Sequence, residues 1–192
     1  MSSTTPDADA NADAPIDTRT RLLQAAAAEF IEHGFNGTDT NRIARRAGFA
    51  PQTFYRWYKD KLDVYVRVYE AWEEAENQLL EALLTSGSAS RRIAEELAEG
   101  HRSFLLFRRN LRQLAADNEQ VRAARAQSRQ RQVAALRGWL PGTPHSDQEL
   151  AALLVAIERL GEALAEGEFD AMGMPPDAAL QLLADLLDRL RG

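Results

Sequence analysis

The 192-residue sequence contains no cysteine, which excludes disulfide bonds and thiolate metal ligands. No apolar run reaches about 18 residues, the length that indicates a membrane-spanning helix. The strict alternation of apolar and polar residues that is typical of half-buried strands is missing as well. Glycine and proline, with 11 and 7 residues, are scarce inside the periodic segments. The sequence therefore favours an all-helical fold.

The first 16 residues are acidic and rich in small polar side chains, with three aspartates and no basic residue. They lack the basic start and the apolar stretch of a secretory signal. Low hydrophobicity combined with net charge predicts that residues 1–16 form a disordered tail. Without a signal or a membrane span, we expect a cytoplasmic protein with no membrane partner.

The net charge of −6 is unevenly distributed along the chain. Residues 17–62 hold eight Lys or Arg against five Asp or Glu, whereas residues 63–192 hold 15 against 21. The distribution of charge is a better guide to a nucleic-acid partner than the total. The sequence thus predicts a small basic domain at 17–62 and a larger acidic domain at 63–192.

Within the basic segment, apolar spacing predicts helices at 18–33, 40–47 and 51–58. Gly34 lies where a residue with positive φ commonly ends a helix. The second and third helices are short and are joined by a tight turn at Gly48. This is the spacing of a helix-turn-helix.

The larger segment continues the helical pattern without an internal repeat. Apolar spacing predicts about nine helices in the whole chain, and those after the helix-turn-helix lie at 60–84, 91–116 (bent near 108–110), 118–140, 147–167 and 175–191.

A group of residues in the basic segment matches a known pattern in both type and spacing. The group consists of Arg21 to Ala26, Phe30, Gly34-Phe35, Thr38, Ile43 to Phe49, Thr53 to Tyr58 and Lys61. With these residues, Thr18 to Trp72 resembles the DNA-binding domain of the TetR/AcrR family of transcriptional regulators. Two positions depart from the pattern: Ala50 replaces a capping serine, and Pro51-Gln52 replaces a small or basic pair. Operator preference therefore does not follow from the resemblance.

The helix at 51–58 has two sides. Phe54 and Tyr58 are expected in the core, and Trp57 stays open between core and surface. The remaining side is expected to enter the DNA major groove, where glutamine pairs with adenine and arginine with guanine. The resemblance adds a phosphate-contacting lysine and backbone contacts from the preceding helix. The predicted DNA-binding residues are Thr40, Arg42, Pro51, Gln52, Thr53, Tyr55, Arg56 and Lys61.

Apolar residues on the last two helices are too many for a single stripe. The resemblance implies that these helices pair with their twins in a homodimer, although part of the surplus is expected to be core of one chain. The predicted interface residues are Leu153, Ile157, Leu160, Leu164, Leu183, Leu186, Leu187 and Leu190.

Residues 101–140 hold nine arginines and two acidic residues. The simpler interpretation is that these arginines pair with the acidic segments on either side. The more specific interpretation is that Arg102 or Arg109 binds an anionic ligand. Apolar and aromatic residues on the long helix at 60–84 and its neighbours are candidates for a ligand pocket, although plain core packing is the simpler interpretation. The candidate ligand-binding residues are Tyr69, Trp72, His101, Arg102, Phe104, Phe107 and Trp139.

The resemblance implies a transcriptional regulator that responds to a ligand. We expect a repressor that binds a palindromic site on double-stranded DNA as a dimer and is released by a small apolar or anionic effector. The alternative is an architectural or nucleoid-associated factor of the same fold without an effector. Three scattered histidines form no metal-ligand cluster, and no nucleophile is paired with a base. We therefore expect neither a metal site, nor a cofactor, nor enzymatic activity.

Overall fold

The computed structural model of the protein describes residues 17–191, so the predicted tail at 1–16 lies outside the described residues. Between residues 17 and 191 there are ten helices and no strand, which confirms the all-α class. The additional helix is a short one in the link that precedes the last helix. The helices are α1 (Thr18–His33), α2 (Thr40–Arg46), α3 (Pro51–Phe54), α4 (Lys61–Thr85), α5 (Ser90–Ser103), α6 (Leu105–Asp117), α7 (Glu119–Trp139), α8 (Asp147–Ala165), α9 (Glu168–Ala171) and α10 (Asp177–Arg191).

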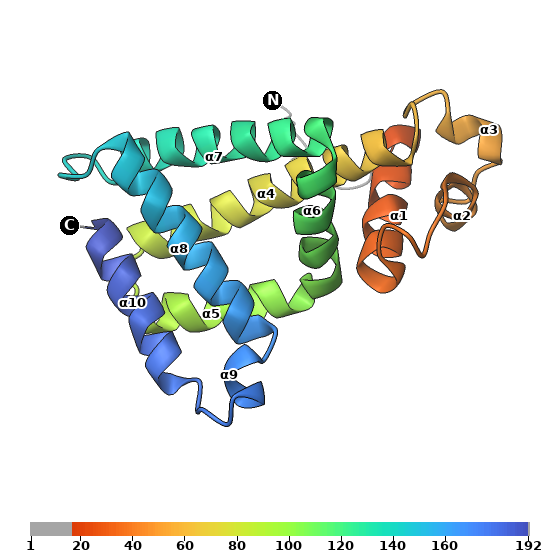
Figure 1. The fold of residues 1–192 in the computed structure, drawn as a ribbon. Coiled ribbons are helices and arrows are strands. Elements are labelled where there is room, and N and C mark those ends of the chain that lie inside the picture. The colour runs from red at the N-terminus through yellow and green to blue at the C-terminus, as the bar shows by residue number, and fades with distance from the viewer. Residues whose placement is uncertain (1–16, 192) are drawn as a thin grey trace, which may run out of the picture.

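The long helix α4 connects the two ends of the molecule (Figure 1). At one end it packs on α1, which also carries α2. At the other end α5, α8 and α10 pack on one another, while α7 runs beside α4. Helix α6 stands between the two ends and contacts both α1 and α7.

Two apolar clusters hold this arrangement together. The first joins α1, α2, α3 and the beginning of α4 to α6 and α7, and its fully buried rings include Phe30, Phe54, Tyr65 and Phe107. Burial of one such side chain stabilises the fold by about 1.5–3 kcal/mol. Because α6 and α7 take part, the first cluster does not stop at residue 62. The predicted boundary between 62 and 63 coincides with the beginning of α4, and the packing continues across it.

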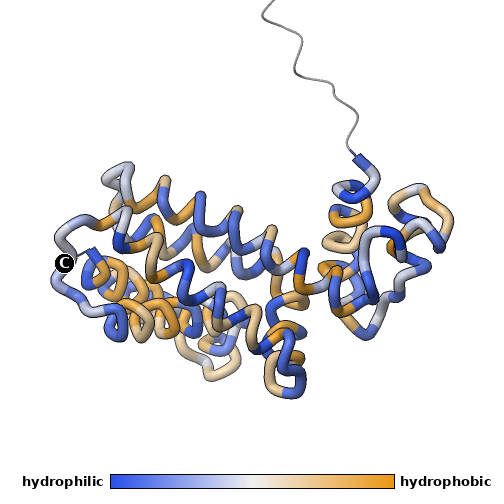
Figure 2. The backbone as a smooth tube through the Cα atoms, turned by 90° about the horizontal axis from the view of Figure 1, so that it is seen from above, coloured by the Kyte–Doolittle hydropathy of each residue, from blue (hydrophilic) through white to orange (hydrophobic). Residues whose placement is uncertain are grey.

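The second cluster is aliphatic and lies among α5, α8, α10 and the end of α4. It includes Ile93, Leu150, Leu183 and Leu187, all fully buried. In Figure 2 the apolar stretches of these helices face one another, with hydrophilic stretches outside. This cluster fixes α5 against α8 and so positions the side chains between them.

The break in the predicted helix 91–116 falls at Phe104, four residues before the expected position. Phe104 has φ −121° and ψ 20°, outside helical values, and α6 begins directly after it. The polar residues at 108–110 do not break the helix because Arg108 reaches acids on α8 and Asn110 reaches the link after α1. Arginine is a good helix former, and the tertiary hydrogen bond of Asn110 outweighs the weaker helix preference of asparagine.

Candidate nucleic-acid interface

The helix-turn-helix is assembled from α2 and α3. Asp39 caps α2, because its carboxylate accepts the backbone N–H of Arg42 at 2.8 Å. At α3, Ala50 provides no side-chain cap, as the sequence predicts, and Pro51 occupies the first turn. Two polar hydroxyls join the elements: Thr40 of α2 and Tyr55 after α3 form a hydrogen bond of 2.9 Å.

The predicted length of α3 is wrong, since the helix ends at Phe54 rather than Tyr58. Residues 55–57 form a turn in which the N–H groups of Trp57 and Tyr58 both donate to the carbonyl of Phe54. The chain leaves the helix so that the Tyr58 ring enters the core and its hydroxyl donates to the carbonyl of Arg19 at 3.1 Å.

This segment has the two sides that its spacing predicts. Phe54 and Tyr58 are buried, which confirms their expected place in the core. Gln52 and Arg56 are exposed, and Thr53 and Pro51 are half-buried. Tyr55 is 59% exposed, and Trp57, left open by the sequence, is 48% exposed and joins the outer side. The outer side therefore presents an amide, a guanidinium and two aromatic rings to solvent.

Lys61 has a structural role that its sequence position does not reveal. Its Nζ donates to the carbonyls of Phe35 at 2.7 Å and Thr38 at 3.1 Å, and it lies 4.2 Å from the centroid of the Phe35 ring. Burial lowers the pKa of this ammonium group. An ammonium group has three donors, so one stays available, and the predicted phosphate contact stays a prediction.

Arg42 is likewise engaged within the protein. Glu29 of α1 is buried, and its carboxylate accepts from Thr38 Oγ1 at 2.7 Å, Arg42 Nε at 3.1 Å and Arg46 Nη1 at 3.2 Å. Burial raises the pKa of Glu29, but the hydrogen bonds from Thr38 and Arg46 outweigh it and hold the pKa below its usual range. The cluster fixes α2 on α1 and leaves Arg45, exposed on α2, as the freer cation.

A small cavity of about 50 Å³ lies between α4, α5, α7 and α8. Of the candidate ligand-binding residues, Tyr69, Trp72 and His101 line it. The other four do not. Arg102 is exposed and pairs with Glu99. Phe107 belongs to the first cluster, the Phe104 ring lies 5.8 Å from that of Trp72, and Trp139 packs on the second cluster. Arg109, the other predicted anion contact, is 55% exposed and pairs with Glu166.

The buried cation of the cavity is Arg108, the neighbour of Arg109. It is 3% exposed, and its guanidinium lies 3.1 Å from Glu158, 3.3 Å from Glu162 and 3.6 Å from Glu76. Seven arginines of 101–140 form ion pairs with acids of α4, of α8 or of the residue that follows α8, which confirms the expected internal pairing: Arg108, Arg109, Arg112, Arg125, Arg129, Arg131 and Arg137. The four-residue spacing of Glu158, Glu162 and Glu166 is the sequence signal that indicates this acidic stripe.

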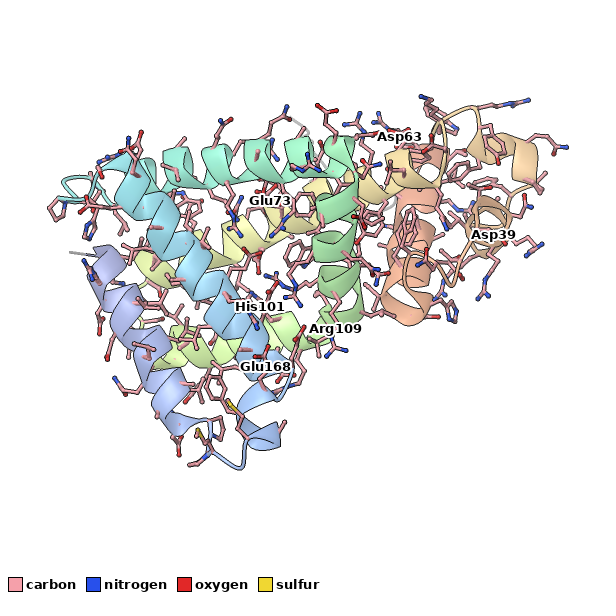
Figure 3. All side chains as sticks on the ribbon, in the orientation of Figure 1. Asp39, Asp63, Glu73, His101, Arg109 and Glu168 are labelled. Carbon is pink, nitrogen blue, oxygen red and sulfur yellow. The ribbon has the colours of Figure 1, made fainter. Side chains whose placement is uncertain are left out.

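His101 is wedged between α4 and α8 (Figure 3). Its Nε2 lies 3.4 Å from Glu76. On the other side, a Cβ atom at Gly161 would lie 2.8 Å from the imidazole. Glycine is thus required at 161 for α8 to approach α5 this closely.

The predicted dimer positions are mostly core of the single chain. Leu183, Leu187 and Leu190 are fully buried and have no surface to offer a second chain. Leu153, Ile157 and Leu164 are 7–8% exposed, while Leu160 and Leu186 are half-buried. The large exposed apolar side chains on these helices are Val155, at 54%, and Leu182, at 51%. These two side chains offer the most apolar surface for pairing through α8 and α10.

Among residues 17–191, no helix is both long enough and apolar enough to cross a membrane.

The helix-turn-helix segment is similar in sequence to a known protein family. Residues 22–68 match the family described as bacterial regulatory proteins, tetR family. YdgC of Bacillus subtilis, an uncharacterized HTH-type transcriptional regulator, is 32% identical over 69 residues, which cover 36% of this chain and 35% of YdgC. The HTH-type transcriptional repressor SCO4008 of Streptomyces coelicolor is 38% identical over 56 residues, or 29% of each protein. The aligned part thus spans only about a third of each relative.

The likeness in fold extends over nearly the whole chain. The transcriptional regulator FadR of Bacillus subtilis, whose structure was solved in complex with stearoyl-CoA, matches with a TM-score of 0.58 over 90% of this chain and 97% of FadR. At 16% identity this match shows the shared fold alone. The similarity in sequence to the tetR family of bacterial regulatory proteins is thus confined to residues 22–68, whereas the similarity in fold covers nearly the whole chain.

Proposed function

We propose that the protein is a transcriptional repressor that binds a palindromic site on double-stranded DNA as a homodimer and leaves it when a small molecule binds. The observation that carries the DNA part is the exposed outer side of the α3 segment, with Gln52, Tyr55, Arg56 and Trp57. These groups lie opposite Phe54 and Tyr58, which are buried in the core. Gln52 and Arg56 have the chemistry to read bases, and the Tyr55 hydroxyl can contact phosphate.

The support for a dimer is geometric. One copy presents one α3, whereas a two-fold dimer presents two, about one DNA turn apart. Val155 and Leu182 give α8 and α10 an exposed apolar contact for a second copy. A two-fold interface uses the same patch on both subunits, so these positions would meet their own counterparts or each other.

The support for an effector is the cavity beside α4, the helix that follows the helix-turn-helix. Its size favours the second candidate, an architectural DNA-binding factor without an effector. A volume of about 50 Å³ is well below the ~300 Å³ of common ligand pockets. Binding of an effector would therefore require displacement of a side chain or a helix.

Selection of bound sequences from random double-stranded DNA tests the proposal. We expect enrichment of one palindromic sequence whose half-sites lie about one helical turn apart. Enrichment of no sequence, with weak binding to every duplex, would support the architectural factor instead. A cytoplasmic location follows from the proposed role, and fractionation of cells checks it.

A further inference from the structure

Three arginines meet one carboxylate inside the larger part of the protein. Arg108 of α6 and Arg125 and Arg129 of α7 all pair with Glu158 of α8, Arg108 at 3.1 Å and Arg125 at 3.6 Å. Within residues 17–191, Glu158 is the sole carboxylate that lies within 4.0 Å of Arg125 or Arg129. Loss of this carboxylate would leave two guanidinium groups without an anion.

The same position adjoins an unsatisfied donor. Arg108 Nη1 is buried and donates no hydrogen bond to the described protein, because its nearest carboxylate, on Glu76, lies 3.6 Å away. Arg108, Arg129 and Glu158 all line the 50 Å³ cavity. A cavity of this size accommodates a few atoms of a polar group. A second acceptor placed there would satisfy the free donor.

The charges of the surrounding network favour an anion. Six arginines of α6 and α7 form ion pairs with five carboxylates of α4, of α8 and of the residue that follows α8: Glu73, Glu76, Glu158, Glu162 and Glu166. If Glu158 turns away, six guanidinium groups face four carboxylates. Guanidinium groups in such a site need a partner. Burial lowers the pKa of Arg129, and the charges of Arg125 and Arg108 add to this effect.

Of the two α8 carboxylates that pair with Arg108, Glu158 is the more exposed and the freer to leave. Its side chain is 20% exposed, whereas that of Glu162 is 4% exposed. The lining of the cavity also includes apolar and aromatic side chains, among them Trp72 on α4, Leu97 on α5 and Ile157 on α8. A molecule with a charged head and an apolar body would match both parts of this lining.

We propose that the effector is a carboxylic acid with a compact apolar or aromatic body, and that its carboxylate replaces that of Glu158 between Arg108, Arg125 and Arg129. This inference rests on the effector part of the proposed function and is independent of DNA binding. Because Arg108 lies on α6, exchange of its partner would remove one ion pair between α6 and α8, while the pair of Arg108 with Glu162 remains. Asn110 of α6 contacts the link after α1, so a shift of α6 would reach the helix-turn-helix unit.

Chemical rescue tests the exchange directly. Glu158→Ala should lower the Tm, and acetate should restore it in a saturable way by about 2–4 °C or more. Acetamide, and chloride at the same ionic strength, should not. Glu158→Gln is the matched control, because its neutral amide fills the position and should leave acetate without effect. A folded Glu158→Ala protein that acetate stabilises no more than chloride contradicts the proposal.

The wild-type protein provides a second measurement if Glu158→Ala does not fold. Calorimetry with benzoate, benzamide and benzylamine should show binding of benzoate alone, and Arg129→Met should weaken that binding at least tenfold. Binding of the amine or the amide at equal strength, binding of benzoate that Arg129→Met does not weaken, or binding of none of the three contradicts the proposal. DNA binding by the wild type without added carboxylate is measured in parallel. If the wild type does not bind DNA, the proposed function is contradicted, whereas the result on carboxylate binding still stands.

Discussion

Asn110 of α6 accepts a hydrogen bond from the backbone N–H of Phe35, the second residue after α1. The neighbouring Gly34 has φ 71°, and a Cβ atom there would lie 2.9 Å from the Asn110 Oδ1 atom. The link of the helix-turn-helix unit therefore touches α6 at a distance that excludes a larger residue than glycine. Two residues before Asn110, Arg108 lines the internal cavity. One turn of α6 thus connects the cavity to the DNA-binding unit.

Replacement of Asn110 by alanine should loosen this link. We expect the amide of Phe35 to exchange its hydrogen at least tenfold faster, because its acceptor is lost. The free energy of unfolding should fall by about 0.5–1.5 kcal/mol, the net value of one hydrogen bond. Hydrogen exchange followed by NMR checks the first effect and urea unfolding the second. Gln113→Ala, at an exposed position of the same helix, is the control and should change neither; unchanged exchange at Phe35 in Asn110→Ala would disprove the link.

Gly161→Ala should destabilise the protein by about 1–3 kcal/mol, because the added Cβ would overlap the His101 imidazole. His101→Ala in the same chain should relieve the overlap, and a double-mutant cycle measures this coupling. Gly138→Ala, in α7 where a Cβ meets no atom within 4 Å, is the control. It should be neutral or stabilise by up to about 1 kcal/mol. Equal stability of Gly138→Ala and Gly161→Ala would show that α8 does not approach His101 this closely.

Stability should depend on pH through Glu29. Although burial raises its pKa, the hydrogen bonds from Thr38 and Arg46 lower it overall in the folded state. As the pH falls, Glu29 therefore takes up a proton in the unfolded chain before it does so in the folded protein. The contribution of Glu29 to stability is complete above its unfolded pKa of about 4.3. It is lost as the pH falls through the lower folded value.

The corresponding measurement is urea unfolding between pH 7 and pH 3. Glu29→Gln should be less stable than the wild type at pH 7, and the difference should shrink as the pH falls below about 4.3. Glu81→Gln, at an exposed position of α4, should follow the wild-type curve. A difference between wild type and Glu29→Gln that stays constant down to pH 3 would exclude the assigned role.

Local chemistry predicts much of the DNA-binding unit. The three-residue and four-residue spacing of Phe54, Trp57 and Tyr58 separates core from surface for two of the three rings. Positive φ at Gly34 and the missing cap at Ala50 also follow from residue type. The structural role of Lys61 does not follow from residue type, because its acceptors are two backbone carbonyls in a link whose path depends on tertiary packing.

The larger part of the protein, after residue 62, shows a different limit of prediction from sequence. The sequence indicates arginines facing acids, but the choice between Arg108 and Arg109 depends on how α6 is rotated. The break at Phe104 sets that rotation, and apolar periodicity places it four residues too late. Similarly, the stripes on α8 and α10 predict an apolar contact without saying which chain provides the other side. The aliphatic cluster with α5 takes most of these residues.

The dimer proposed through α8 and α10 should depend on Val155 and Leu182, which are the exposed apolar residues there. Val155→Glu with Leu182→Glu should shift the protein towards a monomer in sedimentation velocity, because two charges would be buried at a two-fold contact. Leu79→Glu, on an exposed apolar position of α4, should leave the assembly unchanged. A dimer that survives the double substitution must use another surface.

The central claim is that the outer side of the α3 segment reads DNA. Fluorescence anisotropy on the selected operator and on a scrambled duplex, at two salt concentrations, compares wild type with Arg56→Ala and with Arg92→Ala, an exposed arginine of α5. Arg56→Ala should lose about 1–3 kcal/mol on the operator, or roughly 5- to 150-fold in Kd, and much less on the scrambled duplex. Arg92→Ala should match the wild type. Equal operator affinity of wild type and Arg56→Ala, combined with unchanged discrimination between the two duplexes, would contradict the account.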